Sequence, residues 1–148
     1  MKKAVILLAL IACQRVSEPV SHVEVVREET YHELSDWAVL QMAIIMTESR
    51  FNPKVVGKHQ DTGIMQITEI YIKEINRLSG EHFILEDAFD VDKSLLMFDI
   101  MQSFKNPSRD IEKAIYYHNK SPYYKKVVLQ NMEFIRRYEY TRKRLKDE

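Results

Sequence analysis

Glu48 is the residue of this sequence best placed to transfer a proton. It follows an apolar run at residues 42–46 (MAIIM) and stands shortly before Asn52-Pro53. A helix must end before that proline, because the preceding residue is displaced from the α region. A carboxyl at the C-terminal end of a buried helix is held protonated by desolvation and by the negative end of the helix dipole. A protonated carboxylic acid can serve as a general acid, although a lone helix-end glutamate more often points to water.

The elements that must position Glu48 are predicted to be helices. Apolar residues recur at helical spacing through most of the chain after residue 34. We expect helices from Ser35 or Asp36 to about residue 51, and over Ile67–Leu78, Asp90–Phe104, Ser108–His118 and Tyr123–Leu145. Ser35 or Asp36 and Ser108 are typical N-caps, and Gly80 is typical of a position just after a helix. No repeat or strand-rich region stands out, so the sequence predicts one mainly α domain over residues 31–148.

Two of these helices have a predicted buried face. The helix over Asp90–Phe104 is expected to bury Val91, Leu95, Phe98 and either Ile100 or Met101. The last helix is expected to bury a stripe made of Val127, Val128, Met132, Ile135 and Tyr138. Both assignments follow the 3.6-residue period of an amphipathic helix.

Composition and charge exclude several classes of protein. The 148 residues suit one domain, and 22 basic residues balance 22 acidic ones. A nucleic-acid-binding protein usually has a basic excess, so we expect no nucleic-acid partner. Cys13 is the only cysteine, which rules out an intrachain disulfide or a cysteine-based metal cluster. The histidines form no i,i+4 pair, so we expect neither a metal site nor a cofactor.

The N-terminus has the pattern of an export signal. Two lysines precede a nine-residue apolar run over residues 4–12, which is too short to span a bilayer. The run ends in Ala12-Cys13, which resembles a bacterial lipobox; an ordinary signal peptide or a buried strand is the alternative. We therefore expect a signal peptide over residues 1–12, lipidation of Cys13 as a membrane anchor, and a tether over residues 13–30. Gln14, which is not Asp, implies the periplasmic side of the outer membrane under the Gram-negative sorting rule.

Three segments together resemble the signatures of one enzyme family. Residues 48–53 (ESRFNP) resemble the E-S-x-F-x-P signature of soluble lytic transglycosylases and goose-type lysozymes. Residues 61–67 (DTGIMQI) resemble the family's G-x-M-Q segment, and residues 114–119 (AIYYHN) resemble its A-x-x-A-Y-N segment. A fourth segment, N-I-x-x-G, is matched loosely, with Asp90 and Ser94 at the Asn and Gly positions.

The resemblance implies a lysozyme-like fold and cleavage of peptidoglycan glycan strands. Glu48 would protonate the β-1,4 oxygen between N-acetylmuramic acid and N-acetylglucosamine and then act as a base. The muramic 6-hydroxyl would attack and leave a 1,6-anhydro end, without a second enzymic carboxylate. A hydrolytic lysozyme, with Asp61 as a possible second acid, is one alternative. A non-catalytic peptidoglycan-binding lipoprotein is another.

The resemblance also implies substrate contacts around Glu48. Ser49 would bond near the acid or the sugar, or simply end the helix. Gly63 would allow close backbone approach, while Met65 and Gln66 would line the sugar groove. A core position for Met65 is almost as well supported.

The third signature departs from the family. His118 stands where the family has a tyrosine near the catalytic glutamate, and Lys120-Ser121 stands where it has small residues. Either the imidazole replaces the tyrosine as a hydrogen-bond partner, or Tyr117 does so after a shift of one residue. Asn119 would offer its amide to the substrate.

Overall fold

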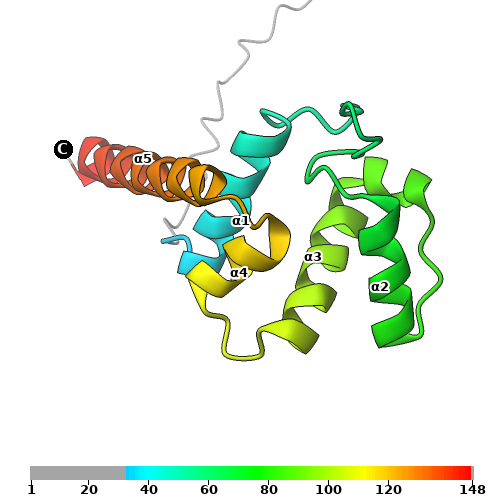
Figure 1. Cartoon of the computed structure of the whole chain (residues 1–148). Helices are drawn as coiled ribbons and strands as arrows, with labels where there is room; N and C mark the ends of the chain where they lie inside the picture. Colours follow the sequence, from blue (N-terminus) through cyan, green and yellow to red (C-terminus); the bar gives the residue numbers. More distant parts are fainter. Residues whose placement is uncertain (1–32, 148) are drawn as a thin grey trace, which may run out of the picture. The chain divides into compact units, whose positions relative to one another are not determined.

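The computed structural model of the chain describes residues 33–147. Predictions for the signal peptide, the tether and Cys13 lie outside these residues. The described part contains the helices α1 (Asp36–Glu48), α2 (Glu69–Ser79), η1 (Leu85–Phe89, a 3₁₀ helix), α3 (Val91–Lys105), α4 (Ile111–His118) and α5 (Pro122–Asp147) (Figure 1). Two isolated β-bridges join Thr62 to Val56 and to Ile67. The mainly α prediction is confirmed.

Helix α1 is buried on several of its faces. Its N-cap is Ser35, whose side chain accepts a hydrogen bond from the Ala38 amide, as the sequence predicts. Val39, Leu40, Ala43, Ile44 and Ile45 are all buried, so several faces of this helix are covered. A helix that is apolar on most sides must have neighbours on most sides. Helices α5 and α4 both pack on it, and α5 makes the more extensive contact.

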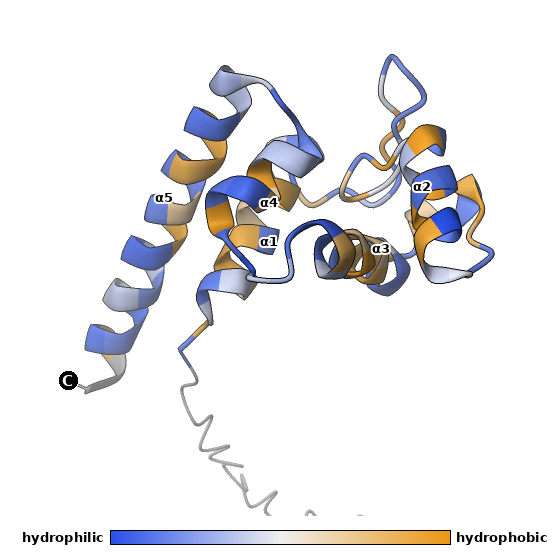
Figure 2. Ribbon diagram, turned by 60° about the horizontal axis from the view of Figure 1, so that its bottom comes forward, coloured by the Kyte–Doolittle hydropathy of each residue, from blue (hydrophilic) through white to orange (hydrophobic). Residues whose placement is uncertain are grey.

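Helix α5 is mainly hydrophilic with separate hydrophobic bands (Figure 2). Val128 and Ile135 are buried as predicted, together with Tyr124. The prediction for Tyr138 is wrong, because its side chain is 65% exposed and Glu139 is buried instead. The Glu139 carboxylate accepts hydrogen bonds from the Leu34 amide and from Arg136. The buried stripe therefore advances by four residues from Ile135, not by three.

The buried face of α3 also differs from its prediction. Phe98 and Met101 are buried as expected, but Val91 is exposed in the first turn. The face instead includes Ser94, Met97 and Gln102. Helix α3 packs against α2, η1 and α4, and it lies between α2 and α4 in both views. Because α3 has neighbours on several sides, it buries more of its surface than the single apolar stripe in its sequence predicts.

Two helix starts differ from the predictions. Helix α4 begins at Ile111 and is capped by Asp110, not by Ser108. The buried Asn106 side chain explains this, because its oxygen accepts from the Ser108 hydroxyl and the Asp110 amide and so holds a turn there. Helix α2 begins two residues later than predicted, after the N-cap Thr68. Gly80 ends it in the left-handed conformation, as predicted. Within residues 33–147 no helix combines the length and apolarity needed to cross a bilayer.

Candidate active site

Glu48 is the last residue of α1, so the helix ends a few residues earlier than the Asn52-Pro53 stop predicts. Ser49 caps the helix, and the next two residues, Arg50 and Phe51, have left-handed backbone angles with φ of 52° and 64°. Two consecutive non-glycine residues in this region store backbone strain. They turn the chain sharply away from the helix axis immediately after the carboxyl-bearing residue.

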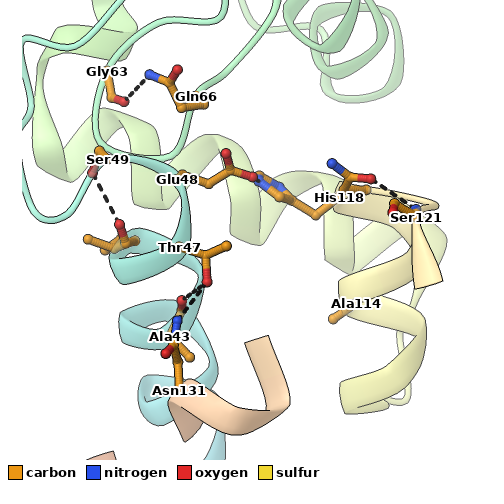
Figure 3. Close-up of polar contacts among 12 residues, drawn as sticks. Ala43, Thr47, Glu48, Ser49, Gly63, Gln66, Ala114, His118, Ser121 and Asn131 are labelled. Atoms are coloured by element: carbon orange, nitrogen blue, oxygen red, sulfur yellow. Dashed lines mark hydrogen bonds and ion pairs between the residues drawn. The ribbon is translucent and has the colours of Figure 1, made fainter. Parts of the chain in front are cut away.

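The Glu48 carboxyl points at the imidazole of His118 (Figure 3). His118 Nε2 lies 3.2 Å from Glu48 Oε1. The His118 side chain is 5% exposed and that of Glu48 is 18% exposed. His118 is the last residue of α4, so two helix C-termini meet at this pair. The negative ends of both helix dipoles therefore lie close to the same pair of side chains.

Three aromatic rings surround the imidazole. The ring centroids of Tyr71, Phe98 and Tyr124 lie 6.2, 5.9 and 6.0 Å from that of His118. Among the described residues, His118 Nδ1 and the hydroxyls of Tyr71 and Tyr124 are buried without a hydrogen-bond partner. Burial raises the pKa of Tyr124 well above its usual range, and its electrostatic and hydrogen-bonding interaction with the Glu48 carboxyl raises it further. Burial also raises the pKa of Tyr71, and the charge of Asp99 adds to this effect. Both phenols therefore remain neutral.

The end of α1 is also held from α5. Asn131 Nδ2 donates to Thr47 Oγ1 over 2.9 Å, and Thr47 Oγ1 donates to the Ala43 carbonyl. Thr47 precedes Glu48 directly, so this bond fixes the last turn of α1 against α5 (Figure 3). Sequence patterns gave no signal for Tyr71, Tyr124 or Asn131 as neighbours of the site, because they come from helices distant in the chain.

The remaining predicted residues of the first and third signatures have local structural contacts. Ser49 is buried and its hydroxyl donates to the Ile45 carbonyl, which is the helix-end role. Tyr117 is exposed and its ring packs against Tyr116, at a centroid distance of 5.9 Å. The imidazole, and not Tyr117, is therefore the partner of Glu48. Asn119 is exposed, and its side-chain oxygen accepts from the Ser121 amide.

The G-x-M-Q segment forms a tight loop. Gly63 has φ of +78°, and a Cβ added to it would lie 1.7 Å from the Ala88 carbonyl oxygen. The same oxygen accepts a hydrogen bond from the fully buried Ser94 hydroxyl, so the loosely matched fourth signature packs against the second. Gln66 is half-buried, and its amide donates to the carbonyl of Gly63 (Figure 3). The same amide also donates to the Val55 carbonyl.

Met65 does not line a groove in this structure. Its side chain is 0% exposed and belongs to the hydrophobic core. The expectation of an apolar contact with sugar is thus replaced by the core position, because the loop turns Met65 inward beside the buried Ile64 and Ile67. Gly63 and Gln66 shape the backbone of the loop.

A family model described as the transglycosylase SLT domain matches residues 25–121. The chain belongs to this family. The SLT match includes α1 to α4, and with them Glu48, His118 and the G-x-M-Q loop. It also confirms the prediction of a lysozyme-like, mainly helical domain. No curated protein and no solved structure matches the chain.

Membership of the SLT family fixes the general activity. The chain is a glycosidase or transglycosylase of the kind that acts on peptidoglycan, and peptidoglycan is its substrate. In the part of the chain that the structure describes, no three His, Asp or Glu side chains gather in a way that could hold a metal ion.

Proposed function

We propose that this protein is a lytic transglycosylase with Glu48 as its catalytic acid and base. It cleaves the β-1,4 bond between N-acetylmuramic acid and N-acetylglucosamine. The supporting observation is the Glu48 carboxyl at the end of the buried helix α1, largely withdrawn from water and paired with a buried imidazole. A carboxyl in such a place, beside a group that can itself accept or donate a proton, is suited to general acid–base chemistry.

The proposed reaction uses one carboxyl twice. Glu48 donates its proton to the glycosidic oxygen, and the bond between that oxygen and the muramic C1 breaks. The resulting carboxylate then removes the proton from the muramic 6-hydroxyl, whose oxygen attacks C1 and closes the 1,6-anhydro ring. The polar neighbours of Glu48 described above are the imidazole of His118 and the phenol of Tyr124, and neither is a carboxylate, which fits a mechanism without a second enzymic carboxylate.

The experiment compares the detergent-solubilised full chain with Glu48→Gln on purified peptidoglycan. Products are separated and identified by mass spectrometry. We expect anhydro muropeptides from the wild type and a loss of rate of roughly 10²–10⁴-fold in Glu48→Gln. Glu81→Gln is the matched control, since Glu81 is an exposed loop glutamate and should retain full activity.

Each other outcome points to a different function. Reducing ends that depend on Glu48 would make the protein a hydrolytic lysozyme. Binding to peptidoglycan without any product from the wild type would leave a wall-binding protein. Full activity of Glu48→Gln would remove Glu48 from the mechanism.

We also propose that Cys13 is lipidated and holds the protein on the periplasmic side of the outer membrane. The support is the sequence of residues 1–13, with its basic start, short apolar run and Ala12-Cys13 junction. The test is fractionation of cells that express the wild type or Cys13→Ser. The wild type should sediment with outer membranes, and the variant should not.

A further inference from the structure

We propose that His118 is a positioning residue that shares one proton with Glu48 and thereby sets the upper pH limit of catalysis. The inference rests on the proposed function, because it concerns the proton of the catalytic acid of that function. It concerns a position where this chain differs from the family signature, which has a tyrosine there.

Geometry makes the two side chains one titrating unit. The distance of 3.2 Å between His118 Nε2 and Glu48 Oε1 allows a hydrogen bond in either protonation arrangement. In one arrangement the carboxylic acid faces a neutral imidazole; in the other, a carboxylate faces an imidazolium. The two contain the same number of protons and differ only in which side chain holds the shared one.

Of the groups that face the His118 imidazole, Glu48 is the one that can carry a negative charge near neutral pH. The groups that face His118 are Glu48 from α1, Tyr71 from α2, Phe98 from α3 and Tyr124 from α5. Tyr71 and Tyr124 are neutral phenols, because burial raises the pKa of each. Asp99 of α3 acts electrostatically on Tyr71, and its carboxylate is bonded to Trp37 and Gln41. A proton gained by the imidazole is thus stabilised chiefly by Glu48.

Two effects oppose each other in deciding which side chain holds the shared proton. Imidazole is intrinsically the stronger base, which favours the ion pair. Burial of both side chains disfavours separated charges and favours the neutral pair. Only the molecules with the proton on Glu48 can protonate the glycosidic oxygen. The bond between that oxygen and the muramic C1 then breaks, as in the proposed reaction.

The pair should lose its shared proton at a higher pH than the carboxyl would alone. Two coupled sites release their last proton at a macroscopic midpoint that is at least as high as that of either site by itself, because that proton can lie on either side chain. Replacing His118 with a hydrogen-bond donor that does not titrate removes one site. The alkaline decline of activity should then move to lower pH, and the rate at the optimum should rise, because the whole protonated population carries its proton on Glu48.

The first test measures kcat/KM against pH on purified peptidoglycan for the full-length wild type, His118→Gln and His118→Tyr. We expect the alkaline decline to move to lower pH and the rate at the optimum to rise in both variants, because only Glu48 can then hold the proton. Circular dichroism and thermal unfolding identify any variant that fails to fold. A decline that stays at the wild-type pH in a folded variant would overturn the inference.

The second test does not depend on activity. Nuclear magnetic resonance follows the His118 imidazole against pH in the wild type and in Glu48→Gln, with His118→Gln used to assign the signals. The titration should shift to lower pH in Glu48→Gln, because the carboxylate that stabilises the imidazolium is gone. An unchanged titration would overturn the inference. Full enzymatic activity of Glu48→Gln, by contrast, would overturn the proposed function, while this titration would still show whether the two groups share a proton.

Discussion

The carbonyl oxygen of Ala88 occupies the space where a side chain on Gly63 would begin. A Cβ at Gly63 would lie 1.7 Å from that oxygen, and the φ of +78° disfavours any other residue there. The contact ties the G-x-M-Q loop to the end of η1, and Ser94 of α3 binds the same carbonyl. Two signatures that are far apart in the sequence therefore form one packed unit.

Gly63→Ala should lower the free energy of unfolding by more than about 3 kcal/mol, because backbone strain and a backbone clash add together. Gly80→Ala is the matched control. Gly80 has the same φ of +78° but has nothing within 4 Å of an added Cβ. It should cost only about 1–2 kcal/mol from the left-handed conformation. Urea unfolding measures both, and equal losses would contradict the close contact.

Met65 should behave as a core residue and not as a substrate contact. Met65→Ala should cost about 2–5 kcal/mol of stability, because it leaves a cavity in a fully buried site. Met65→Leu keeps the volume and should cost less than about 1.5 kcal/mol. The kcat/KM of Met65→Leu on peptidoglycan should equal that of the wild type. A stable Met65→Leu protein with a raised KM would instead place this side chain against the glycan.

Two adjacent residues can test which face of α5 is buried. Glu139→Ala removes the acceptor of the Leu34 amide and of Arg136, and should cost about 1–3 kcal/mol. Tyr138→Ala truncates an exposed ring and should change stability by no more than about 0.5 kcal/mol. Thermal and urea unfolding of both variants provide the comparison. A larger loss from Tyr138→Ala would mean that the helix is rotated from the position seen here.

Alkaline pH should unfold the protein through its buried phenols. Burial raises the pKa of Tyr71 and Tyr124 far above that of an exposed tyrosine. Above pH ~10 the unfolded chain releases these protons while the folded chain retains them, so the free energy of unfolding falls as pH rises. This stability is fully present below pH ~10. Urea unfolding between pH 8 and 11 should show the decline.

Tyr124→Phe and Tyr71→Phe are the controls for the alkaline effect. Each keeps the ring against His118 and removes one titrating hydroxyl, so the decline above pH ~10 should become shallower. Tyr123→Phe, at an exposed neighbouring position, should leave the decline unchanged. If all three variants decline like the wild type, other groups cause the alkaline unfolding.

Local sequence was sufficient for the helices and for the placement of Glu48. An apolar run followed by Asn52-Pro53 fixes the end of α1 within a few residues, and Glu48 is the final residue of that helix. The start of α4 was missed because the Asn106 side chain competes for the Ser108 hydroxyl and the Asp110 amide. That competition depends on Asn106 being buried, which a local pattern does not reveal.

Sequence was less informative about the partners of each side chain. The four-residue step from Ile135 to Glu139 is decided by Leu34 and Arg136, and the local pattern instead favoured the apolar Tyr138. Similarly, the third signature placed His118 and Tyr117 side by side as candidates. Only the packing of α4 against α1 selects the imidazole as the neighbour of Glu48.

The bond between Asn131 and Thr47 has a consequence for how the enzyme is made. The family match stops at residue 121, yet the helix that holds the end of α1 begins at Pro122. During synthesis α1 emerges well before α5, so its main packing partner is missing until α5 has been made. The end of α1 is therefore held in place only after Asn131 has been added to the chain.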